Sequence, residues 1–77
     1  KLFVYMNKQF EFIDEEGNPT KDLWEAVGYG TLEEAKQHLK EFDEPNDWMI
    51  VTKYTNIHIG EIVFGESASK ISGENAQ

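Results

Sequence analysis

Carboxylate side chains crowd two short stretches, residues 14–22 and 41–47, which together hold eight of the 15 acidic residues. Carboxylates form strong charge-assisted hydrogen bonds with basic side chains, and they also bind hard cations such as Ca²⁺ and Mg²⁺. Neither stretch has the spacing of an EF-hand loop or of another metal motif, so we expect no metal site. A protein with a basic surface is the predicted partner. The candidate partner-binding residues are Asp14, Glu15, Glu16, Asp22, Glu41, Asp43, Glu44 and Asp47.

The second acidic stretch, "EFDEPND", follows a predicted helix. A helix C-terminus carries a partial negative charge, so each carboxylate there costs a few tenths of a kcal/mol, up to ~1. An arrangement that destabilises the fold, even mildly, suggests that these residues have a use. The alternative is that loop acids only form turns and keep a small protein in solution.

The residues needed for catalysis are scarce. There is no cysteine, and every serine lies in the predicted tail, between residues 67 and 72. His38 follows Glu34 by four residues, which is typical of a side-chain pair on a helix. Neither His38 nor His58 belongs to a set with metal-ligand spacing, and residues 28–30, "GYG", lack the spacing and the lysine of a phosphate-binding loop. We therefore expect no enzymatic activity and no cofactor.

The formal net charge is −8, the seven basic residues are all lysine, and there is no arginine. This charge repels nucleic acids and anionic membranes, so we expect neither as a direct partner. We expect instead a small acidic protein-binding module. In charge, size and lack of cysteine, the chain is similar to the small acidic inhibitors that phages use against nucleic-acid-binding proteins, some of which imitate DNA. Lys36 and Lys40 interrupt the outer helix face, so any such mimicry is expected at the loops alone.

No stretch approaches the ~18 apolar residues of a membrane span, and no signal segment is recognised. A chain without cysteine is compatible with a reducing compartment, and we expect a cytoplasmic protein. The first residue is Lys1 rather than Met, so we expect that a short stretch before it was removed or left out. We expect one globular domain, residues 1–65, and a flexible tail, residues 66–77.

Residues 31–42 have the clearest local pattern. Thr31 and Glu34 form a predicted capping box, and Pro45 prevents the helix from continuing. Residues 1–14 and 48–65 are rich in aromatic and branched side chains and predict strands, with a bulge or turn at residues 7–8 and a turn near residues 55–56. Residues 21–30 fit either a strand or a short helix capped by Asn18, and we favour a strand paired with residues 9–14.

These elements predict an α+β fold of the order β-β-α-β-β, in which one helix packs on one face of an antiparallel sheet of about four strands. The tight connection at residues 28–30 makes the segment before it antiparallel to the helix, so the two acidic stretches are expected at the same end. The predicted core consists of Leu32, Ala35, Leu39, Phe42, Phe10, Phe12, Trp24, Trp48, Ile50, Ile62 and Phe64.

Self-association is the alternative function. An open sheet has two edges, and the predicted last strand, "IHIGEIVFG", carries a single charge, Glu61, to oppose pairing with a second copy. Tyr5, Tyr29 and Tyr54 are suited to such an interface. A third hypothesis is that the tail binds a partner through its one large apolar residue, Ile71.

Overall fold

The computed structural model describes residues 1–55 and 58–65. The predicted tail and the hypothesis about Ile71 lie outside these residues. The described part is an α+β fold whose antiparallel sheet has five strands rather than four. Among the residues described, no helix is long and apolar enough to cross a membrane.

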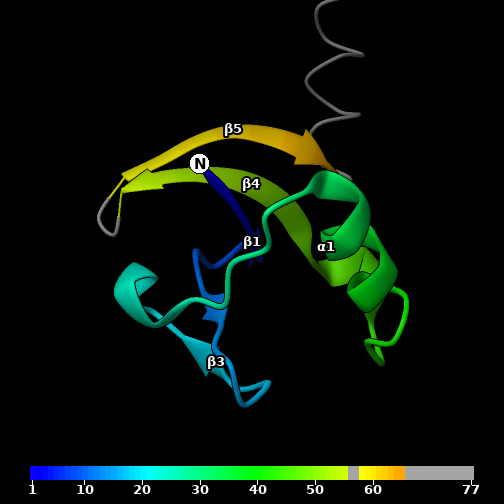
Figure 1. The fold of residues 1–77 in the computed structure, drawn as a ribbon. Helices are drawn as coiled ribbons and strands as arrows, with labels where there is room; N and C mark the ends of the chain where they lie inside the picture. Colours follow the sequence, from blue (N-terminus) through cyan, green and yellow to red (C-terminus); the bar gives the residue numbers. More distant parts are fainter. Residues whose placement is uncertain (56–57, 66–77) are drawn as a thin grey trace, which may run out of the picture.

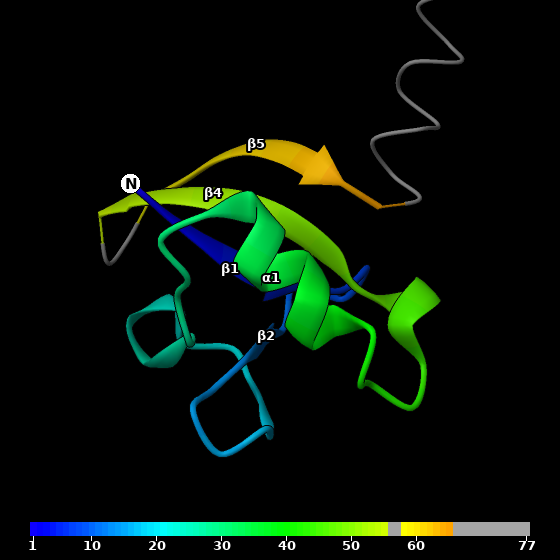
Figure 2. The same cartoon turned by 45° about the vertical axis from the view of Figure 1, so that its right-hand side comes forward.

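The sheet has the strand order β3-β2-β1-β4-β5. Its long strands are β1 (Leu2–Met6), β4 (Met49–Thr55) and β5 (His58–Phe64), while β2 (Phe12–Ile13) and β3 (Pro19–Thr20) are two-residue strands. The single α-helix of the described residues, α1 (Leu32–Leu39), lies against one face of the sheet over β1 and β4 (Figure 1, Figure 2). The curved pair β4–β5 forms one side of the molecule, and β3 lies on the other (Figure 1).

The predicted break in the first strand is a turn. The buried side chain of Asn7 accepts hydrogen bonds from the backbone N–H groups of Gln9 and Glu11 and donates one to the Glu11 carboxylate. These bonds reverse the chain between β1 and β2, which pair through Met6 and Phe12. Phe10, in the turn, adopts a φ of 61°.

Residues 21–30 form neither the favoured strand nor the alternative α-helix. A short 3-10 helix, η1 (Leu23–Glu25), is capped by Asp22, whose side chain accepts from the Trp24 N–H. Asn18 is not the cap. The chain then runs extended, and Phe3 and Tyr29 exchange two backbone hydrogen bonds. The strand paired with β2 is instead β3, because the chain reverses in the turn at residues 14–18. Part of the predicted pairing remains, since Asp14 and Ala26 form a bridge and the Val27 N–H donates a hydrogen bond to the Ile13 carbonyl.

Helix α1 begins as predicted and ends earlier. The Thr31 hydroxyl accepts a hydrogen bond from the Glu34 N–H, as a capping residue should. The regular helix stops at Leu39, and tighter bonds from the Glu41 N–H to the His38 carbonyl and from the Phe42 N–H to the Leu39 carbonyl follow it. Another 3-10 helix, η2 (Pro45–Asp47), then leads into β4.

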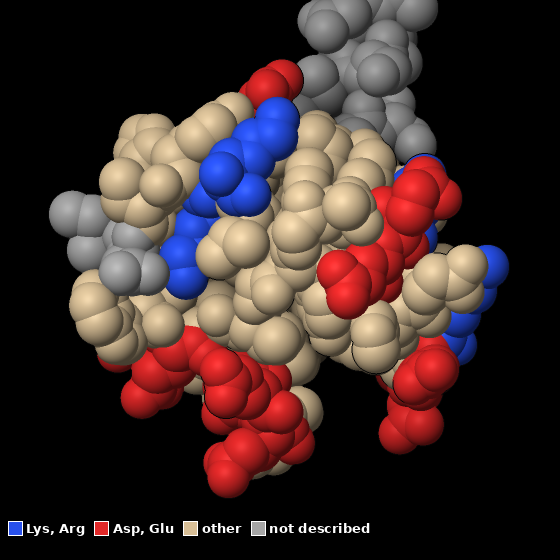
Figure 3. Space-filling model, in the orientation of Figure 1, with Lys and Arg blue, Asp and Glu red and all other residues tan. Residues whose placement is uncertain are grey.

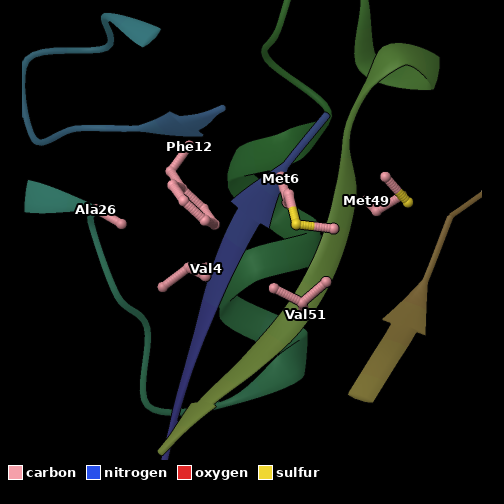
Figure 4. Close-up of a cluster of buried hydrophobic side chains, with 6 residues drawn as sticks. All are labelled: Val4, Met6, Phe12, Ala26, Met49 and Val51. Atoms are coloured by element: carbon pink, nitrogen blue, oxygen red, sulfur yellow. The ribbon is translucent and has the colours of Figure 1, made fainter. Parts of the chain in front are cut away.

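The core lies on both faces of the sheet. On the α1 face, Tyr5, Ile50 and Ile13 pack with Ala35 and Leu39, and Leu32, Phe42 and Trp48 lie at the edge of this cluster. The opposite face holds Val4, Met6, Phe12, Ala26, Met49 and Val51 (Figure 4).

Five of the residues that were predicted to pack against the helix in the core lie elsewhere in the structure. Phe12 and Ile62 belong to the face opposite the helix. Phe10 and Trp24 are 67% and 66% exposed, and Phe64 is 40% exposed. Phe10 is in a turn and Trp24 is in η1, so neither follows the alternation of a strand on which the prediction rested.

Candidate functional site

The two acidic stretches face each other across an open depression. We call residues 14–18 the first acidic loop and residues 41–47 the second acidic loop. The interloop pocket, with a volume of about 450 Å³, is lined by both sides. Its lining residues are Ile13, Gly17, Pro19, Glu41, Phe42, Asp43, Glu44, Asp47 and Trp48.

The side chain of Asp14 organises the first acidic loop. One of its carboxylate oxygens accepts hydrogen bonds from the backbone N–H groups of Glu16 and Asn18, both at 2.9 Å. Gly17 closes the turn at a φ of 86°, a conformation that suits glycine. Asp14 is therefore held by the turn, while the side chains of Glu15 and Glu16 are exposed.

The second acidic loop follows directly from the end of α1. The bonds after Leu39 bring Glu41 and Phe42 out of the helix, and η2 places Asp47 beside the start of β4. No side-chain hydrogen bond from Glu44 caps η2, so this carboxylate has no capping role. Glu41, Asp43, Glu44 and Asp47 are all exposed and all line the interloop pocket.

A second depression adjoins the first and shares Ile13, Gly17, Glu41 and Phe42 with it. This helix pocket, of about 260 Å³, brings Asp14 and Glu15 of the first loop together with Glu41 of the second. Within the described residues, no three acidic or histidine side chains are grouped so that they could hold a metal ion.

Aromatic rings form a connected row, and each residue of this row lines at least one of the two pockets. His38 stacks on Tyr29 with ring centres 4.8 Å apart. This is the contact seen for the His38 ring, in place of the predicted pair with Glu34. Tyr5 packs edge-on against Tyr29 and Phe42, at 5.7 and 4.9 Å. Phe42 is in turn perpendicular to Trp48, at 6.2 Å. The interloop pocket is thus lined by the apolar and aromatic residues Ile13, Phe42 and Trp48, which we call its floor, and by four acidic residues, which we call its rim.

Tyr5 anchors this row to the helix. Its hydroxyl donates a 2.6 Å hydrogen bond to the Ala35 carbonyl, and the residue is 1% exposed. Burial raises the pKa of the Tyr5 hydroxyl well above its ordinary value, and Tyr29 and the carboxylates of Glu34 and Glu41 raise it further. Tyr5 is therefore unavailable to the predicted interface, where Tyr54, 49% exposed, remains accessible.

Six of the eight candidate residues line at least one of the two pockets, and Glu41 lines both. Glu16 lies in the first loop but lines neither pocket, and Asp22 caps η1 outside them. Figure 3 shows acidic side chains in two groups along the lower edge of the molecule, one near β3 and one below α1, with a gap between them, and a further acidic group higher up, over α1. The acidic side chains on this face thus form separate groups rather than one continuous patch.

The sequence prediction did not include Phe42 and Trp48 among the site residues, because it assigned both of them to the core. In the structure, both line the interloop pocket. A signal was available, because the two aromatics flank the second acidic loop in "FDEPNDW". Side chains at the two ends of a short loop are necessarily close to its polar residues, so such a segment combines an aromatic wall with carboxylates.

Comparisons with protein-family models, with curated proteins and with solved structures found no match for this chain.

Proposed function

We propose that this protein is a small non-enzymatic binding module that presents its two acidic loops to a basic surface of a partner protein. The observation that carries this proposal is the interloop pocket, on which four exposed carboxylates of the second loop converge opposite the first loop. A cytoplasmic location remains part of the proposal.

Electrostatics supports a charged partner over a neutral one. Like charges at the rim of a shared pocket repel each other, weakly in water and more strongly where water is excluded. A basic surface removes that repulsion, and the net charge of −8 accelerates its approach. An inhibitor of a nucleic-acid-binding protein, of the kind that phages make, is the most specific form of the proposal, because carboxylates can occupy a cleft built for phosphates.

The test begins with capture of a partner from the source cell and elution with salt. Affinity is then measured for wild type and for the double variant Asp43→Lys/Glu44→Lys. The control, Glu33→Lys/Glu61→Lys, changes the net charge equally with exposed residues outside the pockets. We expect the loop variant to lose at least about tenfold in affinity, or ~1.4 kcal/mol. Equal losses in both variants would contradict a site at the loops.

Self-association is a second candidate, favoured by the position of β5 at an edge of the sheet. Phe64 on β5 and Tyr54 on β4 are large and exposed. Register shifts between β4 and β5 oppose it, because irregular edge strands pair poorly with a second copy. Sedimentation at increasing concentration is the test, and a monomer at the highest concentration would eliminate this candidate.

A further inference from the structure

We propose that the interloop pocket receives one arginine side chain of the partner, with the guanidinium group against Phe42 and Trp48 and within reach of the carboxylates of the second acidic loop. This inference rests on the function proposed above and names the group that the site recognises. The evidence is the combination of an apolar floor with an anionic rim in one depression.

The volume is sufficient for one side chain of a partner. At about 450 Å³, the interloop pocket lies toward the lower end of the roughly 300–1,000 Å³ range of small-molecule sites. Ile13 is buried, and Phe42 and Trp48 are partly buried, so the pocket offers apolar contacts to an aliphatic stem.

Charge complementarity selects a cation. Four exposed carboxylates on the pocket lining repel anions, and covering them with a neutral apolar group would remove their water without providing a new partner. A cationic side chain satisfies the carboxylates as it enters.

The aromatic floor favours arginine over lysine. A guanidinium is planar and weakly hydrated, stacks on aromatic rings and offers five donors to surrounding carboxylates. The ammonium of lysine is strongly hydrated and loses more on entering a pocket walled by rings. The rings of Phe42 and Trp48 are nearly perpendicular, with centres 6.2 Å apart, and both residues line the same pocket as Asp43 and Glu44. A planar guanidinium can therefore stack on one of these rings while it reaches a carboxylate.

The probes are three blocked tripeptides, acetyl-Gly-X-Gly-amide, in which X is arginine, lysine or citrulline, the last a neutral copy of the arginine shape. The protein carries Trp24→Phe, so that Trp48 is its remaining tryptophan. Trp48 fluorescence and the backbone amide NMR shifts of residues 13–19 and 41–48 are followed during titration at low salt.

We expect saturable shifts with the arginine peptide, at least threefold weaker affinity for lysine and no saturation with citrulline. Glu44→Gln should weaken arginine binding at least threefold, while Glu61→Gln, outside the pocket, should not. Trp48→Leu should reduce the preference for arginine over lysine. If it alters the fold, the comparison of arginine with citrulline on the protein that retains Trp48 still decides.

Two outcomes overturn this inference in different ways. If arginine and lysine bind equally and the shifts spread over exposed acids outside the pocket, the arginine site is wrong while the proposed acidic binding function stands. If neither cationic peptide binds, and an arginine-rich nonapeptide also fails to bind at low salt, both the pocket assignment and the proposed function fail.

Discussion

Phe10 is held at a φ of 61° in the turn between β1 and β2, in the left-handed region that a bulky side chain rarely adopts. Its ring is 67% exposed and contributes little to the core. Phe10→Gly should therefore raise the free energy of unfolding, by up to about 1 kcal/mol, because glycine adopts this conformation without a Cβ clash. Chemical denaturation measures the change. Phe10→Ala, which keeps the Cβ, is the control, and an equal gain in both variants would show that the backbone is not the cause.

Tyr5 should make the protein sensitive to alkaline pH. Its folded-state pKa is raised above the ordinary value of 10.0, chiefly by burial. The stability that the neutral hydroxyl supports is fully present below pH ~10 and is lost as the pH rises toward the folded pKa.

Tyr5→Phe should lower the free energy of unfolding at pH 8 by about 1 kcal/mol, because the hydrogen bond to Ala35 is lost. Between pH 10 and 11.5, stability should then fall less steeply in the variant than in wild type. Denaturation curves across this range provide the comparison, and parallel declines would show that Tyr5 is not the titrating group responsible.

At the scale of the elements, the turn of the first acidic loop depends on Gly17. An alanine there meets no neighbouring atom within 4 Å, so its cost is that of the backbone conformation alone. Gly17→Ala should lower the free energy of unfolding by about 1 kcal/mol. Gly30→Ala is the matched control, since its added Cβ also meets no neighbour and its φ lies outside the left-handed region. Equal effects of the two variants on the denaturation midpoint would contradict this account of the turn.

Elements with strong local signals were predictable. Thr31 identified the start of α1, because a cap and an apolar stripe are properties of a few neighbouring residues. Residues 21–30 were not predictable in this way. Asp22 competes with Asn18 as a cap, and the bridge from Tyr29 to Phe3 joins residues far apart in the sequence. Local patterns contain no information about such distant pairing.

On the scale of the whole molecule, the tight connection at residues 28–30 led to the prediction that the two acidic stretches share one end, although the segment before it is neither the strand nor the α-helix that the prediction assumed. Six of the eight candidate acids do line the adjoining pockets. The aromatic floor was missed because a half-buried ring such as Trp48 has the same sequence pattern whether its exposed edge faces solvent or a pocket. Tertiary packing decides between these two cases.

Crowding of carboxylates should make stability depend on salt. Repulsion between exposed acids amounts to a few tenths of a kcal/mol per pair and is screened as ionic strength rises. We expect the thermal midpoint to rise between about 10 mM and 500 mM sodium chloride, and to rise less in Asp43→Lys/Glu44→Lys than in Glu33→Lys/Glu61→Lys. An equal rise in both variants would place the repulsion outside the second loop.

The most direct measurement for the central claim is the affinity of an arginine-rich nonapeptide for wild type, for Asp43→Lys/Glu44→Lys and for Glu33→Lys/Glu61→Lys at one low salt concentration. If the acidic loops form the binding site, Asp43→Lys/Glu44→Lys should bind the peptide at least about tenfold more weakly than wild type. The affinity of Glu33→Lys/Glu61→Lys should change by less than about threefold, although both variants gain the same charge. Identical losses in the two variants would show that the peptide senses only net charge, and the proposed site would then have no support.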